Sequence, residues 1–139
     1  GVGWDSQISV PPVEELRWLE YGQRLHTRHR NIAVRADSPS VGDTLLQGAL
    51  ASGARATGQA VGSLRGDMAD SLLLDADAPL LVGAHAGDLP HRWIFSGTRP
   101  LLAEVHVGGR EVVAGGRHAE AGPIAAAYAV AMRRRLAEV

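Results

Sequence analysis

The sequence of 139 residues contains neither cysteine nor lysine. All fourteen of its Lys and Arg positions are arginine. The lack of cysteine excludes disulfide frameworks, zinc sites made of thiolates, and thiol nucleophiles. The lack of lysine means that the chain can supply neither a Schiff-base lysine nor the lysine of a phosphate-binding P-loop. Several large reaction classes are therefore beyond what this chain can carry by itself.

The chain also lacks a strong net charge and a long apolar run. Its formal net charge is -1 and its pI is near 6.6, so it has no overall positive field to attract a phosphate backbone, and we expect no nucleic-acid partner. No apolar stretch approaches the about 20 residues that a membrane-spanning helix needs, and no secretory signal opens the sequence. With 45% hydrophobic and 21% charged residues, the chain is expected to be soluble and cytoplasmic, without a membrane partner.

The first helical pattern covers residues Val13 to Arg30. Pro11 and Pro12 precede it, and proline suits the first turn of a helix. Apolar residues recur at helical spacing and give a wide face that should be buried. Acidic residues lie at its beginning and basic residues at its end, which complements the helix dipole.

A second helix is predicted from Val41 to Ala51. Ser40 followed by Asp43 resembles a capping box at its start. Gly53 is expected to end it, and a short helical turn over 54–57 should then stop at Gly58.

After the second predicted helix the sequence pattern changes, because short apolar runs are separated by glycine and proline. These runs predict strands. The Gly108-Gly109 pair can supply the positive backbone angles of a tight two-residue turn, so a hairpin is expected there. Pro123 is expected to open a last helix, Ile124 to Ala137. The predicted strands are Ser71 to Leu74, Arg92 to Phe95, Leu102 to Val107 and Arg110 to Val113.

Several clusters of polar residues have ordinary structural explanations. His26 and His29 are three residues apart on the first helical pattern, but the arginines around them oppose the binding of a cation, which favours a solvated basic helix end. The other histidines show no ligand spacing, and His106 alternates with valines on a strand, so it should face away from the apolar side. The three arginines at 133–135 are explained by the helix dipole and by solubility.

Asp5 directly follows Gly1-Val2-Gly3-Trp4, which reads like the tail of a strand cut open upstream. A carboxylate at the end of a strand occupies the position where α/β barrels place catalytic groups. Judged by this pattern alone, an aspartate after glycines is more often a turn former or a helix cap. The same opening leads us to expect that the chain starts within a longer protein.

The run Glu20-Tyr21-Gly22-Gln23-Arg24 lies within a longer segment that begins at Asp5. This segment resembles the N-formimino-L-glutamate (formimidoylglutamate) deiminases of the amidohydrolase superfamily, and the Glu20 to Arg24 run is its most specific part. Residues 51–58 are similar to the helix pair by which amidohydrolase chains leave the barrel. Residues 62–75 resemble the glycine-led return of these chains into a small β-sandwich. The likeness covers nearly the whole chain.

The resemblance implies an α/β parent, in which a metal-dependent TIM barrel carries a small composite β-sandwich. In this chain it implies that residues 1–58 hold the end of the eighth barrel strand and the following helices. Residues 59–122 would form the C-terminal, antiparallel part of the sandwich, and 123–139 a terminal helix. A complete barrel needs about 250 residues, so this chain would be the C-terminal fragment of its parent.

The resemblance also implies a site. An aspartate at the end of strand eight lies beside the metal and shuttles protons in that superfamily, which makes Asp5 the expected catalytic residue and metal neighbour. The cofactor would be zinc, with its histidine ligands upstream and absent from this chain. Trp4 and Gln7 depart from the residues common in these enzymes and leave the identity of the substrate open.

The expected function is hydrolysis of N-formimino-L-glutamate to N-formyl-L-glutamate and ammonia, a step of histidine degradation, by the intact parent. The isolated chain is expected to be inactive. One alternative is another amidohydrolase deaminase that acts on a heterocyclic amine, and the other is a non-catalytic β module used for assembly. The expected partners are a small-molecule substrate, the remainder of the parent polypeptide, and further copies in a homo-oligomer.

Overall fold

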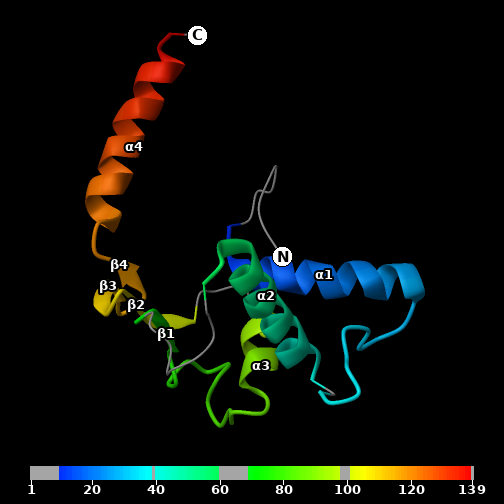
Figure 1. The fold of residues 1–139 in the computed structure, drawn as a ribbon. Helices are drawn as coiled ribbons and strands as arrows, with labels where there is room; N and C mark the ends of the chain where they lie inside the picture. The colour runs from blue at the N-terminus through cyan, green and yellow to red at the C-terminus, as the bar shows by residue number, and fades with distance from the viewer. Residues whose placement is uncertain (1–9, 39, 60–68, 98–100, 139) are drawn as a thin grey trace. The chain divides into compact units, whose positions relative to one another are not determined.

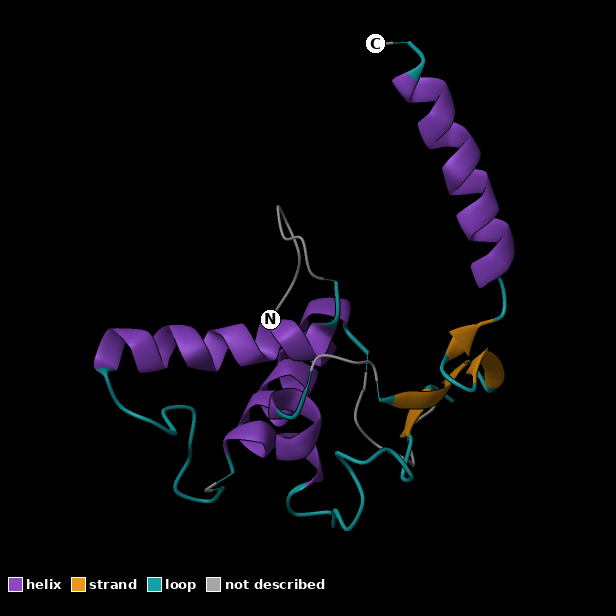
Figure 2. Ribbon diagram, turned by 180° about the vertical axis from the view of Figure 1, so that it is seen from behind, coloured by secondary structure: helices purple, strands orange, loops and turns teal. Residues whose placement is uncertain are grey.

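The structure is a computed structural model that describes residues 10–38, 40–59, 69–97 and 101–138. The described part contains four α-helices and one four-stranded antiparallel sheet. The chain divides into two compact units, one made of Gly1–Met68 with Asp75–Leu101 and the other of Ala69–Leu74 with Leu102–Val139. Figure 1 labels the elements in chain order, and Figure 2 colours them by type.

Helix α1, Pro12–Thr27, confirms the first helical pattern, with one more residue at its start and three fewer at its end. Pro12 occupies the first turn, as expected of a residue with no N–H to donate. The helix ends earlier than predicted because Arg28 adopts a left-handed conformation, with φ 59°. The backbone N–H of Arg28 then closes the end by donating to the carbonyl of Arg24 at 2.8 Å.

Helix α2, Val41–Thr57, begins at the predicted cap. The Ser40 hydroxyl accepts from the backbone N–H of Asp43 at 3.3 Å. The expected stop at Gly53 is wrong, since one continuous helix runs on to Gly58, which has φ 70°. A glycine inside a helix costs only about 1 kcal/mol, and the hydrogen bonds of a continuous helix outweigh that cost.

Helix α3, Leu89–Phe95, corrects a predicted strand, because the run from Arg92 to Phe95 is helical. Pro90 lies in its first turn, where proline favours a helix. Ile94 is fully buried and forms a core with Leu16, Val41 and Leu45. A short helix lets this one side chain enter the core while the backbone hydrogen bonds stay within the segment.

The three helices of the first unit pack closely (Figure 1). A Cβ atom on Gly42 would lie 2.4 Å from the Cα of His91, so only glycine permits this approach of α2 to α3. Arg17 of α1 donates from Nε to the carbonyl of Ile94 and from a terminal nitrogen to that of Gly97, both at 2.7 Å. These bonds join α1 to the carbonyl end of α3.

The second unit contains the sheet, whose strands are orange in Figure 2. Their order is β1-β2-β3-β4, and every neighbouring pair is antiparallel. The first three strands confirm the prediction, and Gly108 and Gly109 form the expected turn with φ of 57° and 77°. The short strand β4 was not predicted, although Gly115-Gly116 repeats the same turn signal with φ of 54° and 73°. The strands are β1 Ser71–Leu74, β2 Leu102–Val107, β3 Arg110–Ala114 and β4 Arg117–His118.

Helix α4, Ala121–Leu136, begins three residues before the predicted start and ends one residue before the predicted end. It has no buried residue, and Ile124, Tyr128 and Leu136 are 59%, 65% and 70% exposed. None of the helices in the described ranges has the length and apolar character required to cross a membrane. The predicted division at 1–58, 59–122 and 123–139 refers to the parent fold and stays a prediction.

Candidate functional site

The residue predicted to be catalytic and metal-bound, Asp5, lies outside the described residues, as do Trp4 and Gln7. Its assignment therefore stays a prediction. The two histidines of the first helical pattern do not share a helix, because His26 lies in the last turn of α1 and His29 follows its end. His29 Nδ1 lies 2.7 Å from the carbonyl oxygen of Thr27, and both histidines are exposed.

A buried polar group of the first unit is centred on Glu20, whose side chain is fully buried. One of its oxygens accepts from Arg24 Nε at 2.7 Å and from the Ile32 N–H at 3.1 Å. The other accepts from the Ala33 N–H at 2.9 Å. Burial alone would raise the pKa of Glu20, but the hydrogen bonds from Arg24, Ala33 and Ile32 together hold that pKa below its usual value.

This arrangement gives the Glu20 to Arg24 run a structural task. Residues four apart on a helix lie on the same face, so Glu20 and Arg24 can pair while the carboxylate also holds the connection after α1. The Arg24 guanidinium lies 5.3 Å from the ring centre of Tyr21 and 5.5 Å from that of Phe95. The run therefore fixes α1, its following connection and α3 together, and it shows no feature of a reaction centre.

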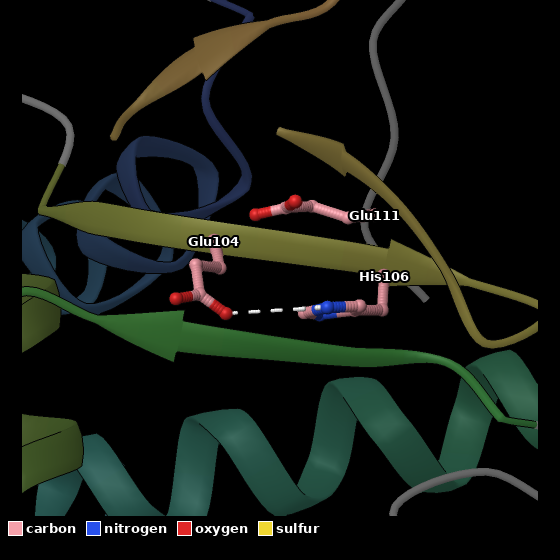
Figure 3. A group of neighbouring side chains, drawn as sticks. All are labelled: Glu104, His106 and Glu111. Carbon is pink, nitrogen blue, oxygen red and sulfur yellow. Dashed lines mark ion pairs between the residues drawn. The ribbon is translucent and has the colours of Figure 1, made fainter. Parts of the chain in front are cut away.

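One group of side chains in the described ranges could hold a metal ion, and it lies in the second unit. It consists of Glu104 and His106 on β2 with Glu111 on β3 (Figure 3). Glu104 Oε2 and His106 Nε2 are 4.0 Å apart, and one potential ligand atom from each of the three residues lies within 4.8 Å of the others. This group was missed by the sequence reasoning, which found no ligand spacing around His106.

The signal for that group was present in the sequence. In a hairpin with Gly108-Gly109 as its two-residue turn, Val107 pairs with Arg110 and His106 pairs with Glu111, as observed. Glu104 lies two residues before His106 on the same strand, and side chains two apart share a face. The pattern becomes visible only when positions on both strands are considered together.

Comparison with known proteins finds relatives by sequence and by structure. The formimidoylglutamate deiminase of Pseudomonas aeruginosa is 52% identical over 120 residues, which are 86% of this chain and 26% of that protein. The crystal structure of an amidohydrolase from Brucella melitensis matches with a TM-score of 0.83 and 32% identity, over 98% of this chain and 30% of that one. No protein-family model matches the chain.

The chain thus spans about a quarter of the length of its curated relative and less than a third of the matched structure. The sequence identity to the deiminase and the structural match to the amidohydrolase together confirm the resemblance predicted from the sequence. This chain is accordingly homologous to the amidohydrolase enzymes, and its sequence matches about a quarter of the length of a formimidoylglutamate deiminase.

Proposed function

We propose that this chain is the C-terminal part of a zinc-dependent deiminase that hydrolyses N-formimino-L-glutamate to N-formyl-L-glutamate and ammonia. The observation that carries the proposal is the 52% identity to a formimidoylglutamate deiminase over 86% of the chain. The structural match to an amidohydrolase supports a parent with a TIM barrel and a composite β-sandwich. The four-stranded antiparallel sheet of this chain would supply one part of that sandwich.

The exposed apolar side chains support a role for the remainder of the parent polypeptide. On α1, Trp18 is 54% exposed and Leu25 78% exposed, although the helix carries the wide apolar face that the sequence predicts should be buried. Monomeric proteins rarely expose large contiguous apolar surfaces. We propose that the barrel and the other strands of the sandwich cover α1 and the sheet in the parent.

Asp5 is the residue of this chain that we propose takes part in the reaction. A bound zinc ion supplies an activated water in enzymes of this kind. The carboxylate of Asp5 would accept the proton of that water and later give it to the departing ammonia. One carboxylate cannot form a three-ligand zinc site, so the histidine ligands would come from upstream strands, and this chain alone would not retain the catalytic zinc at Asp5.

The test of Asp5 uses a chimera in which this chain replaces the matching segment of the Pseudomonas aeruginosa enzyme. We expect the chimera to release ammonia from N-formimino-L-glutamate, and Asp5→Asn to lower kcat by about a hundredfold or more, because the amide cannot accept the proton. Asp37→Asn is the matched control, since Asp37 is an exposed aspartate that pairs with Arg35. Near-normal turnover by the Asp5→Asn chimera would show that Asp5 is a turn residue.

The substrate is tested separately, in the longer polypeptide that we propose carries this chain. Ammonia release is measured with N-formimino-L-glutamate and with a panel of heterocyclic amines. The proposal requires turnover of the first compound. A preference for a heterocyclic amine would instead identify the enzyme as another amidohydrolase deaminase.

A further inference from the structure

Three potential metal ligands share one face of the sheet, at the hairpin between β2 and β3. Glu104 and His106 are two residues apart on β2, so their side chains point to the same face. Glu111 lies directly opposite His106 in the antiparallel pair and therefore joins them on that face. Figure 3 shows the three side chains together, with the Glu104–His106 ion pair marked.

The local backbone fixes this arrangement. The Gly108-Gly109 turn sets the pairing of His106 with Glu111, and a register shift follows immediately, since Val105 pairs with Val113 rather than with Val112. An irregularity of this kind inserts an extra residue and changes the direction in which neighbouring side chains point. The ligand positions therefore follow from backbone geometry on two strands rather than from a flexible loop.

The electrostatic surroundings favour a cation. Among the described residues, neither Glu104 nor Glu111 pairs with an arginine, and the partner of Glu104 is His106. Arg110, next to Glu111 in the sequence, lies on the opposite face because side chains alternate along a strand. Two carboxylates thus face one imidazole, a combination that repels further negative charge and attracts a positive ion.

His106 has a polar atom that its described neighbours leave unsatisfied. Its side chain is 27% exposed, but Nδ1 is buried and has no hydrogen-bond partner. A buried polar atom without a partner costs about 1–3 kcal/mol. Coordination through Nε2 would not remove that cost, but because Nδ1 is buried, Nε2, which faces Glu104, is the nitrogen that an ion could reach.

We propose that Glu104, His106 and Glu111 form a binding site for a first-row divalent cation such as Zn²⁺. Imidazole is a good ligand for zinc and its neighbours in the transition series, while Mg²⁺ and Ca²⁺ prefer oxygen ligands alone. Bonds of about 2.1 Å to a common ion allow two ligand atoms to be at most about 4.2 Å apart. The observed limit of 4.8 Å is close to this value, and small rotations of the partly exposed glutamates would bring the ligand atoms within it.

The proposed ligands lie on β2 and β3, and none of them is Asp5. A bound ion would join β2 to β3 beside their turn and would stabilise the second unit. Its expected effect is therefore a higher Tm of the sheet.

The experiment measures binding of Zn²⁺ and Co²⁺ to the metal-free 139-residue chain by calorimetry and by the visible absorption of cobalt. We expect one ion per chain, with affinity lowered at least about tenfold in His106→Gln, Glu104→Gln and Glu111→Gln, since each removes one of three ligands. The histidine control is His118→Gln, on the exposed strand β4 outside the group. The Asp5→Asn chain should bind the ion as the unchanged chain does.

Three results would overturn the proposal. The first is a folded chain, judged by circular dichroism, that takes up no Zn²⁺ or Co²⁺. The second is His118→Gln weakening binding as much as His106→Gln. The third is loss of binding in Asp5→Asn with all three ligand variants unaffected, which would move the metal to the proposed active site.

Discussion

Replacement of Glu20 by glutamine should destabilise the first unit far more than its small change in shape implies. The carboxylate of Glu20 is fully buried and accepts three hydrogen bonds, from Arg24 and from the backbone of Ile32 and Ala33. Glutamine retains one acceptor oxygen, and its amide nitrogen replaces the other oxygen. At least one donor would therefore face another donor.

The size of the effect follows from these contacts. A hydrogen bond to a charged group contributes about 1.5–3 kcal/mol, and removing one partner of a buried ion pair costs about 3–5 kcal/mol. Arg24 is 22% exposed and can regain some contact with water, which favours the lower end of that range. We expect Glu20→Gln to lower the free energy of unfolding of this unit by about 3 kcal/mol.

Urea unfolding followed by tryptophan fluorescence measures this quantity for the correct unit, since Trp18 and Trp93 lie on α1 and α3 and the residues of the second unit include no tryptophan. Asp37→Asn is the control, because the Arg35–Asp37 pair is also on the connection after α1 but is exposed. An exposed ion pair contributes no more than about 1 kcal/mol. If Glu20→Gln and Asp37→Asn lowered the free energy of unfolding by the same amount, the role assigned to Glu20 would be refuted.

The stabilising effect of Glu20 should also depend on pH. In the folded chain the hydrogen bonds hold the pKa of Glu20 below its ordinary value of 4.5, so the folded state favours the ionised form. Its contribution is complete above pH 4.5 and is lost as the pH falls through the lower folded pKa. The stability difference between the unchanged chain and Glu20→Gln should therefore shrink at acid pH, and a difference that grows there would contradict the reasoning.

The remaining predictions concern the helix contact and the reaction. Gly42→Ala should lower the stability of the first unit by at least about 1–3 kcal/mol, because its Cβ would meet the backbone of His91 and Pro90. Gly48→Ala lies on the same helix with nothing within 4 Å of the new Cβ, so it should raise the stability of the first unit by up to about 1 kcal/mol. Thermal unfolding measures both variants, and a Gly42→Ala chain more stable than the Gly48→Ala chain would contradict the reasoning. The purified chain alone should release no ammonia from N-formimino-L-glutamate, because one aspartate cannot hold zinc, and turnover free of contaminating enzyme would disprove this.

Local chemistry made much of the fold predictable. Prolines before α1, the serine cap of α2 and the double-glycine turn each act through the few residues beside them, and all three were located from the sequence. The strand predicted over Arg92 to Phe95 was wrong because a four-residue apolar run has no distinguishable period. Pro90, two residues before that run, was the signal for the helix. The predicted helix end at Gly53 was wrong because a glycine can also lie inside a helix. Gly58, with φ 70°, is the glycine that takes the left-handed conformation and ends α2.

The candidate metal group shows the limit of examining residues along one strand. His106 on its own has the neighbours of an ordinary strand residue, and Glu111 lies beyond a turn. Their proximity depends on pairing register, which the Gly108-Gly109 turn determines but which spacing within a single strand does not reveal. The expected orientation of His106 and the observed group are compatible, because the face away from the apolar side is also where the two glutamates point.

The run on which the resemblance chiefly rests, Glu20 to Arg24, has a structural explanation that does not involve Asp5. The Glu20 to Arg24 run is specific because several demands meet in it: a buried carboxylate, an arginine four residues later, and an aromatic ring beside that arginine. A substitution at one of these positions leaves a buried charge or donor without its partner, which costs more than most surface changes. These demands are structural and do not depend on the substrate that the parent binds. The substrate has to be established through Asp5 and the ligands that we propose lie upstream.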